Sequence, residues 1–116
     1  MAHLEQEQLH VINLSPSNGV LSAPMIYQGT VDAIYLRVAE VFRPAILDNA
    51  TALYVAHNHP GGEPEPNPED RLVTERIIAA GRLLDIAVID HLVIGRSGFF
   101  SMRDAGIGFD PLPWRT

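Results

Sequence analysis

Residues 52–70 read ALYVAHNHPGGEPEPNPED, and this stretch decides the fold. Its first part, residues 52–56, is short, apolar and uncharged, which predicts a buried strand running into His57 and His59. Strand side chains alternate with a period of two, so these two histidines point to the same side. The loop after them contains too much Pro and Gly to be regular.

A helix is predicted directly after this loop. Asn67 suits the N-cap position, Pro68 the first helical position, and the acids that follow suit the first turn. Asp70 is therefore expected about one turn into the helix, close to His57 and His59. Two imidazoles and a carboxylate suit a divalent metal, above all zinc, and three protein ligands leave one tetrahedral position for water. That open position is typical of a catalytic metal site.

Length and composition indicate one globular domain spanning residues 1–116. The chain is 47% hydrophobic and 19% charged, with no long charge run. It has no cysteine, so any zinc must be held by histidine and carboxylate. No apolar run approaches the roughly 18 residues of a membrane span, and no secretory signal is recognisable, so we expect a cytoplasmic protein. The formal net charge of −6 argues against nucleic acid as a partner.

Periodicity along the chain predicts strands interleaved with two helices, hence an α/β fold with a mixed β-sheet flanked by helices. We expect a mobile lead over 1–6 and an irregular tail over 107–116. The predicted strands cover 8–14, 20–28, 51–57, 86–94 and 99–102, and the predicted helices run from about 38 to 47 and from 68 to about 84.

Two prolines and one dipeptide refine this prediction. Asn18-Gly19 is typical of a hairpin turn between the first two strands. Pro24 within the second strand indicates an edge or a bulge. Pro44 predicts either a kink in the first helix or a helix that begins late enough to place Pro44 in its first turn.

The motif of residues 57–70 resembles the JAMM motif of the JAB/MPN metalloproteases. Its sequence, HNHPGGEPEPNPED, is similar to that of the RadC branch of the family. Further similar stretches are 29–31, 80–84, 90–95 and 101–104, so the resemblance runs from about Glu7 to Gly106. It implies the α/β sandwich of the JAB/MPN fold, which is similar to the deaminase fold. Full-length RadC-like proteins carry a further N-terminal region resembling a helix-hairpin-helix module, to which nothing in this chain corresponds.

The resemblance also implies a function: a zinc-dependent hydrolase that cleaves a peptide or isopeptide amide bond with a metal-activated water. His57, His59 and Asp70 would hold the metal. Glu7 would be the general base, and Asn67 stands where the family usually has the serine that helps to hold the oxyanion. The expected partner is a peptide or protein substrate, and the oligomeric state stays open.

Several alternatives remain at this point. Glu5 and Glu40 are rival bases, and Asn67 can be an N-cap and nothing more. Because Asn67 departs from the family pattern, the alternative function is a catalytically weak or inactive metal-binding domain that serves as a protein-interaction module. Deamination of a nucleobase is disfavoured, since that chemistry uses cysteine ligands.

His91 follows Asp90 in another predicted strand. The pair resembles a carboxylate–histidine couple, but neighbours in a strand point to opposite faces. We therefore expect His91 to pack in the core, with a contact to a metal ligand as the alternative.

Overall fold

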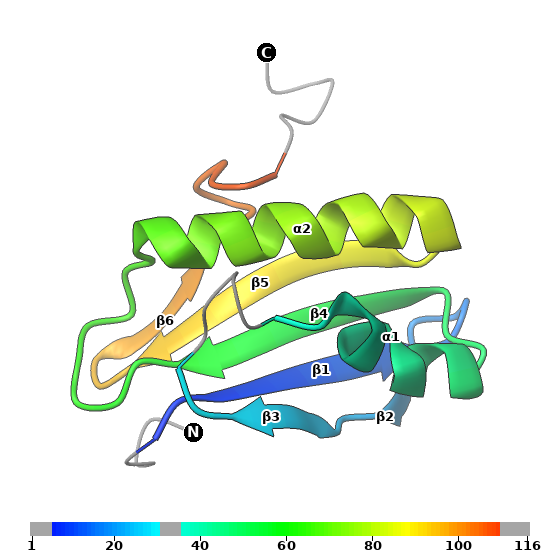
Figure 1. The fold of residues 1–116 in the computed structure, drawn as a ribbon, viewed down its shortest axis with the longest axis horizontal. Coiled ribbons are helices and arrows are strands. Elements are labelled where there is room, and N and C mark those ends of the chain that lie inside the picture. The colour runs from blue at the N-terminus through cyan, green and yellow to red at the C-terminus, as the bar shows by residue number, and fades with distance from the viewer. Residues whose placement is uncertain (1–5, 31–35, 110–116) are drawn as a thin grey trace.

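The computed structural model describes residues 6–30 and 36–109. The predicted lead and tail therefore lie mostly outside the described residues, as does Glu5. Figure 1 shows the order of the elements along the chain. They are β1 (Gln8–Leu14), β2 (Val20–Ser22), β3 (Met25–Gln28), α1 (Val38–Leu47), β4 (Ala52–Asn58), α2 (Pro68–Leu84), β5 (Ala87–Gly95) and β6 (Gly98–Ser101).

The six strands form one mixed sheet in the order β2-β1-β4-β5-β6, with β3 also paired to β1. β4 lies in the middle, antiparallel to β1 and parallel to β5. Its parallel pairing requires a crossover, which α2 supplies. The expected mixed α/β fold is confirmed, and the central strand is the one that ends in the two histidines.

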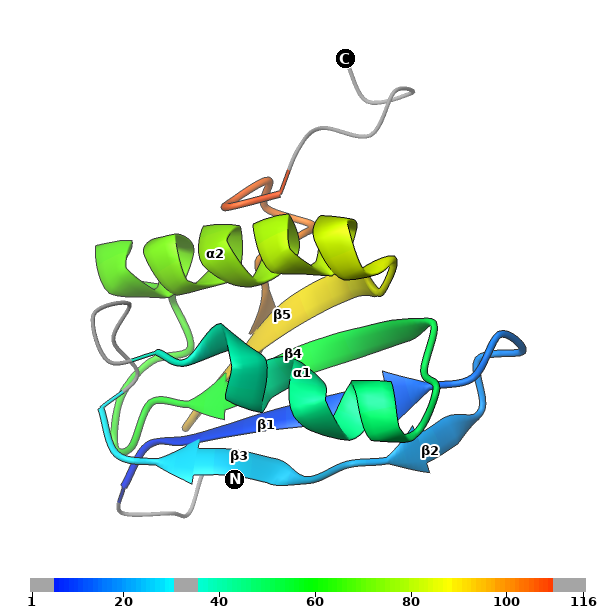
Figure 2. The same ribbon diagram turned by 45° about the vertical axis from the view of Figure 1, so that its right-hand side comes forward.

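Both helices contribute to one hydrophobic core on the same side of the sheet. α1 lies across β1 and β4, and α2 runs along β5 (Figure 2). The core joins alternate residues of β1 and β4 to the apolar faces of the helices, with Leu9, Val11, Leu53, Val55, Phe42, Val73 and Ile77 at its centre. This packing fixes the start of α2 relative to the end of β4.

Pro24 and Pro44 have different effects on the elements in which they were predicted. Pro24 interrupts the predicted second strand and divides it into β2 and β3 at the sheet edge, as its missing N–H predicts. Pro44 lies well inside α1, so of the two alternatives for this proline the late helix start is wrong. The bond lost is one to the carbonyl of exposed Glu40, which water can reach. Burial of Phe42 and Ala45 on the opposite side offsets the loss.

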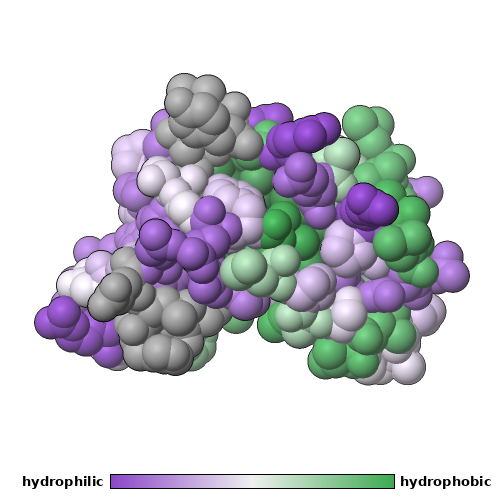
Figure 3. Space-filling model, turned by 60° about the horizontal axis from the view of Figure 1, so that its bottom comes forward, coloured by the Kyte–Doolittle hydropathy of each residue, from purple (hydrophilic) through white to green (hydrophobic). Residues whose placement is uncertain are grey.

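The surface is hydrophilic at the end of the molecule to which β4 points. In Figure 3 this end is at the left, and hydrophobic side chains gather toward the centre and right. The exposed apolar residues Ile46, Leu47, Leu83 and Leu84 lie at the C-terminal ends of the two helices. Within the described ranges, neither helix combines the length and the apolar character that crossing a membrane requires.

Candidate metal centre

The carboxyl end of β4 places the two histidines. Leu9 of β1 pairs with His57, and Val93 of β5 flanks it on the other side. His57 is fully buried and the His59 side chain is only 14% exposed. Because both lie on the same side of the strand, as the sequence predicted, their rings meet edge to face with centroids 4.9 Å apart.

The first turn of α2 places the carboxylate. Asn67 is the N-cap, as predicted, and its Oδ1 accepts a hydrogen bond from the Asp70 backbone N–H at 2.9 Å. In return the Asp70 Oδ2 accepts from the Asn67 N–H at 2.7 Å, which completes a reciprocal capping box. Asp70 is only 1% exposed. Its carboxylate is therefore held by the helix end through one oxygen while the other faces His57.

The two imidazoles and the carboxylate lie close together. The His57 Nε2 lies 3.0 Å from the Asp70 Oδ1, the His59 Nε2 lies 3.1 Å from the Asp70 Oδ2, and the two Nε2 atoms are 3.1 Å apart. Ligands on a tetrahedral zinc, with bonds of about 2.0 Å, lie about 3.3 Å from one another. With one ligand atom from each residue, the three atoms lie within 4.8 Å of one another, so these residues could hold a metal ion.

The loop between β4 and α2 orients His59. The His59 Nδ1 lies 3.1 Å from the carbonyl oxygen of Glu63, and since a carbonyl only accepts, Nδ1 carries the proton. The Nε2 of His59 then faces the centre. The loop is tied to β5 by a bond from the His59 N–H to the Ile94 carbonyl at 2.8 Å. It also passes so close to Gly95 that a Cβ there would lie 2.4 Å from the Pro64 nitrogen.

The electrostatics of the centre favour an ionised Asp70. Burial by itself would raise the pKa of this carboxyl. Three interactions act in the opposite direction and hold the pKa of Asp70 below its ordinary value. They are the hydrogen bond and charge attraction to His57, the hydrogen bond from the Asn67 N–H, and the charge attraction to His59. An ionised carboxylate is the form of this side chain that binds a divalent cation.

His91 does more than pack, so the packing prediction is corrected in favour of its alternative. Its fully buried Nε2 lies 2.7 Å from the His57 Nδ1. The reason is a β-bulge: Leu53 pairs with Val88 but Tyr54 pairs with Asp90, so residue 89 has no partner in β4. This extra residue moves His91 onto the face occupied by His57. A single sequence gives no signal for it.

Asp90 is indeed not the partner of the His91 ring. Its Oδ1 accepts from the backbone N–H groups of His91 at 2.7 Å and Arg103 at 3.0 Å, and its Oδ2 accepts from the Ser101 hydroxyl. Asp90 thus fixes the turn after β6. Burial lowers the pKa of His91 well below its ordinary value, with the neighbouring His57 acting in the same direction, so the ring is neutral.

Asn58 is a residue that the sequence analysis overlooked. Its side chain is fully buried on the other face of β4. Its Oδ1 accepts from the Gln8 N–H at 2.6 Å, and its Nδ2 donates to the Gln6 carbonyl at 2.9 Å. These bonds bracket Glu7, whose own carbonyl accepts from the Gly29 N–H at 2.8 Å. The backbone on both sides of Glu7 is therefore fixed beside the histidines.

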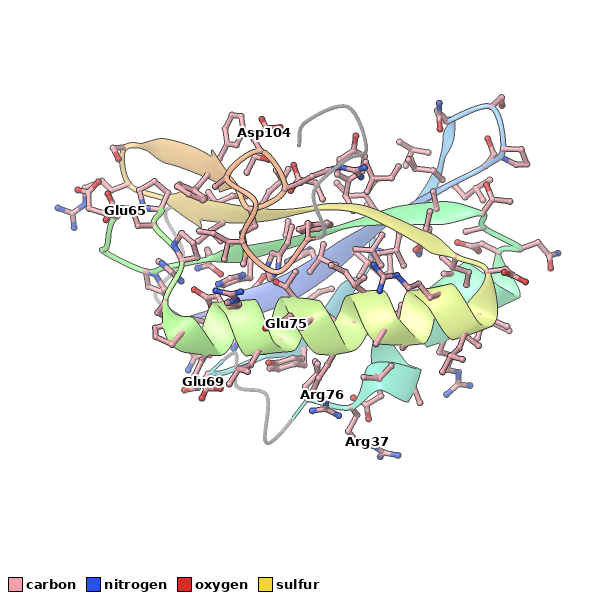
Figure 4. The ribbon with its side chains drawn as sticks, turned by 90° about the horizontal axis from the view of Figure 1, so that it is seen from above. Arg37, Glu65, Glu69, Glu75, Arg76 and Asp104 are labelled. Atoms are coloured by element: carbon pink, nitrogen blue, oxygen red, sulfur yellow. The ribbon has the colours of Figure 1, made fainter. Side chains whose placement is uncertain are left out.

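The remaining acids differ in their surroundings. Glu40 is exposed and lies 3.5 Å from Arg37, one turn away on α1. Glu63 accepts from the Ser97 hydroxyl at 2.8 Å. Figure 4 shows Glu65 on the loop and Glu69 in the first turn of α2, both at the end of the helix that carries Asp70. Acidic side chains therefore gather at the end of α2 that carries Asp70.

Comparison with known proteins agrees with this geometry and with the expected JAB/MPN fold. The model of the protein family described as "RadC-like JAB domain" matches residues 1–107 of this chain. A UPF0758 protein of Roseiflexus castenholzii is 50% identical over 109 residues, which cover 94% of this chain and 47% of that protein. UPF0758 proteins of Chloroflexus aggregans (46% identical; 95% and 48% covered) and Thermotoga maritima (42%; 91% and 48%) are also similar. The chain spans about half the length of these curated relatives. It belongs to the RadC-like JAB domain family.

Proposed function

We propose that the protein is a zinc-dependent hydrolase of the JAMM type that cleaves a peptide or isopeptide amide bond. The observation behind the proposal is the convergence of the His57 Nε2, the His59 Nε2 and the Asp70 carboxylate within 4.8 Å of one another. Nitrogen and oxygen donors suit zinc, and three of them leave a position for substrate or water. When bound, zinc would activate a water molecule and polarise the carbonyl of the amide.

Glu7 is the proposed general base. Leu9 pairs with His57, and Glu7 lies two residues before Leu9, directly ahead of β1. If the two-residue period of the strand continues to Glu7, its side chain lies beside the end of β4 and on the same face as the histidines, which supports the proposal. In this role its carboxylate takes a proton from the attacking water and passes it to the leaving amine. The two bonds from Asn58 support the assignment, because a base must be held at a fixed distance from the water.

Asn67 is the proposed donor to the oxyanion. Its Oδ1 is committed to the helix cap, which fixes the orientation of the amide group. The amide NH₂ can donate to the negative charge that develops on the carbonyl oxygen, as a serine hydroxyl would. Exposure of Asn67 at the entrance of the centre is compatible with contact to a substrate.

The substrate class belongs to the same proposal. We expect a peptide or protein, because the net charge of −6 disfavours the phosphate backbone of nucleic acids. The acidic residues on the loop and at the start of α2 favour substrates that carry positive charge near the bond to be cleaved. A cytoplasmic location is also proposed, and fractionation of cells tests it.

The alternative is a metal-binding interaction module without turnover. One observation favours it: Asn67 replaces the serine usual in the family, and its Oδ1 is used by the capping box. In this case the centre would bind zinc as described, and the bound ion would stabilise the start of α2 against β4.

One experiment separates these functions. Metal-free protein is reloaded with zinc, its metal content is measured by elemental analysis, and it is incubated with a library of linear and Lys-branched peptides read by mass spectrometry. We expect about one zinc per chain and new amide cleavages, and neither in Asp70→Asn, which has the same shape but lacks the charge. Zinc uptake with no cleavage of any peptide would favour the interaction module. Absence of zinc uptake would contradict both.

A further inference from the structure

A chain of buried hydrogen bonds extends behind His57. The His57 Nδ1 lies 2.7 Å from the His91 Nε2, and the His91 Nδ1 lies 2.5 Å from the Thr74 Oγ1. The Thr74 Oγ1 in turn lies 2.7 Å from the backbone carbonyl of Asp70. All four residues are at most 1% exposed. Since bulk water has no access, each proton in this chain has to be placed by the protein.

The backbone carbonyl sets the direction of the chain. A carbonyl oxygen only accepts, so the single hydroxyl proton of Thr74 points to Asp70. The Thr74 oxygen then offers a lone pair to the His91 Nδ1, which must carry the ring proton. A neutral imidazole has one such proton, so the His91 Nε2 accepts, and the His57 Nδ1 donates to it. The Nε2 of His57 is then the ring nitrogen that faces Asp70 and His59.

We propose that Thr74 and His91 are positioning residues that hold a proton on the His57 Nδ1 and so turn its Nε2 toward the metal position. This inference rests on the proposed metal site. The reverse direction would place a proton on the His57 Nε2, where it would block coordination. It would also leave the Thr74 oxygen and the Asp70 carbonyl in contact at 2.7 Å with no proton between them.

His57 and His59 thus both carry a proton on Nδ1, but different groups accept the hydrogen bond from it. His59 lies at the surface of the loop, where the Glu63 carbonyl can accept its Nδ1–H directly. His57 faces the core, and its Nδ1 meets an imidazole, which can either donate or accept. Thr74, through its contact with His91, decides that the His91 Nε2 accepts. Thr74 lies one helical turn after Asp70. α2 therefore supplies both a ligand and the residue that sets the tautomer of another ligand.

The tautomer can be observed without any metal. We suggest two-bond ¹H–¹⁵N spectra of the imidazole rings in metal-free protein, with the His57 signals assigned by their loss in His57→Asn. The expected pattern is a protonated Nδ1 for His57, and a protonated Nδ1 with an unprotonated Nε2 for His91. An unprotonated His57 Nδ1 would overturn the proposal. This measurement does not depend on zinc binding or on activity.

A matched pair of variants tests the role of the hydroxyl. Thr74→Val keeps the shape of the side chain and removes the proton and the acceptor, whereas Thr74→Ser keeps both. Competition with a chromophoric chelator should show zinc affinity about 10- to 100-fold weaker in Thr74→Val, and within about threefold of wild type in Thr74→Ser. Equal affinities in the two variants would overturn the proposal while leaving the proposed function intact.

Circular dichroism shows whether each variant is folded. If Thr74→Val does not fold, the ring spectra of the wild-type protein and of Thr74→Ser decide the question. If wild-type protein takes up no zinc, the proposed function fails, and the same spectra still report the tautomer. The two failures are therefore distinguishable.

Discussion

Replacing Asn58 by Ala should loosen the segment that carries Glu7 without harming the metal ligands. The side chain makes two hydrogen bonds, to the Gln8 N–H and the Gln6 carbonyl, at 2.6 and 2.9 Å. Each is worth about 1 kcal/mol when its partners can turn to water. Gln6 is exposed and Gln8 is half-buried, so water can replace the amide. The expected loss in the free energy of unfolding is therefore about 2 kcal/mol.

The loss can be measured by urea denaturation of metal-free protein, followed by circular dichroism. For a chain of this size it corresponds to a decrease in melting temperature of about 8 °C. Asn58→Asp is the matched control: its carboxylate can still accept from Gln8 but cannot donate to Gln6, so it should lose at least about 1 kcal/mol. Zinc affinity of Asn58→Ala should stay within about threefold of wild type, because neither bond reaches a ligand.

Two results would refute this reasoning. A change below about 0.5 kcal/mol in Asn58→Ala, the range of ordinary surface substitutions, would mean that the amide does not hold the segment. A large decrease in zinc affinity with unchanged stability would mean that Asn58 acts on the metal centre and not on Glu7.

Three further substitutions address other parts of the site. Asn67→Ser should leave zinc binding intact, since serine also caps a helix, and metal loss measured by elemental analysis would refute the assignment. Glu7→Gln should keep zinc but slow cleavage of any identified peptide by about 100-fold or more; full turnover in a kinetic assay would exclude Glu7 as the base. Gly95→Ala should lower stability by about 1–3 kcal/mol, because its Cβ would lie 2.4 Å from the Pro64 nitrogen and displace the loop that orients His59. Unchanged melting temperature and zinc affinity in Gly95→Ala would show that the loop can move without loss of stability, which would contradict this prediction.

Local signals in the sequence predicted the parts of the site that depend on local structure. The N-cap at Asn67 and the helix after it follow from side-chain and backbone bonds within a few residues. The common direction of His57 and His59 follows from the two-residue period of a strand. These features need no knowledge of the rest of the chain, and the structure shows all of them.

The features that the sequence did not reveal depend on distant packing. The position of His91 depends on a bulge between Val88 and Asp90, where the sequence is simply apolar. The role of Asn58 depends on its partners, about 50 residues earlier in the chain. Pro44 is tolerated inside α1 because the core beneath it stabilises the helix. Such effects belong to tertiary structure, which overrides local preference.

The most direct test of the metal centre is anomalous diffraction at the zinc absorption edge from crystals of the zinc-loaded protein. The account predicts one peak at about 2.0–2.2 Å from the His57 Nε2, the His59 Nε2 and an oxygen of Asp70. A zinc ion bound elsewhere, or these three side chains without any anomalous peak between them, would contradict it.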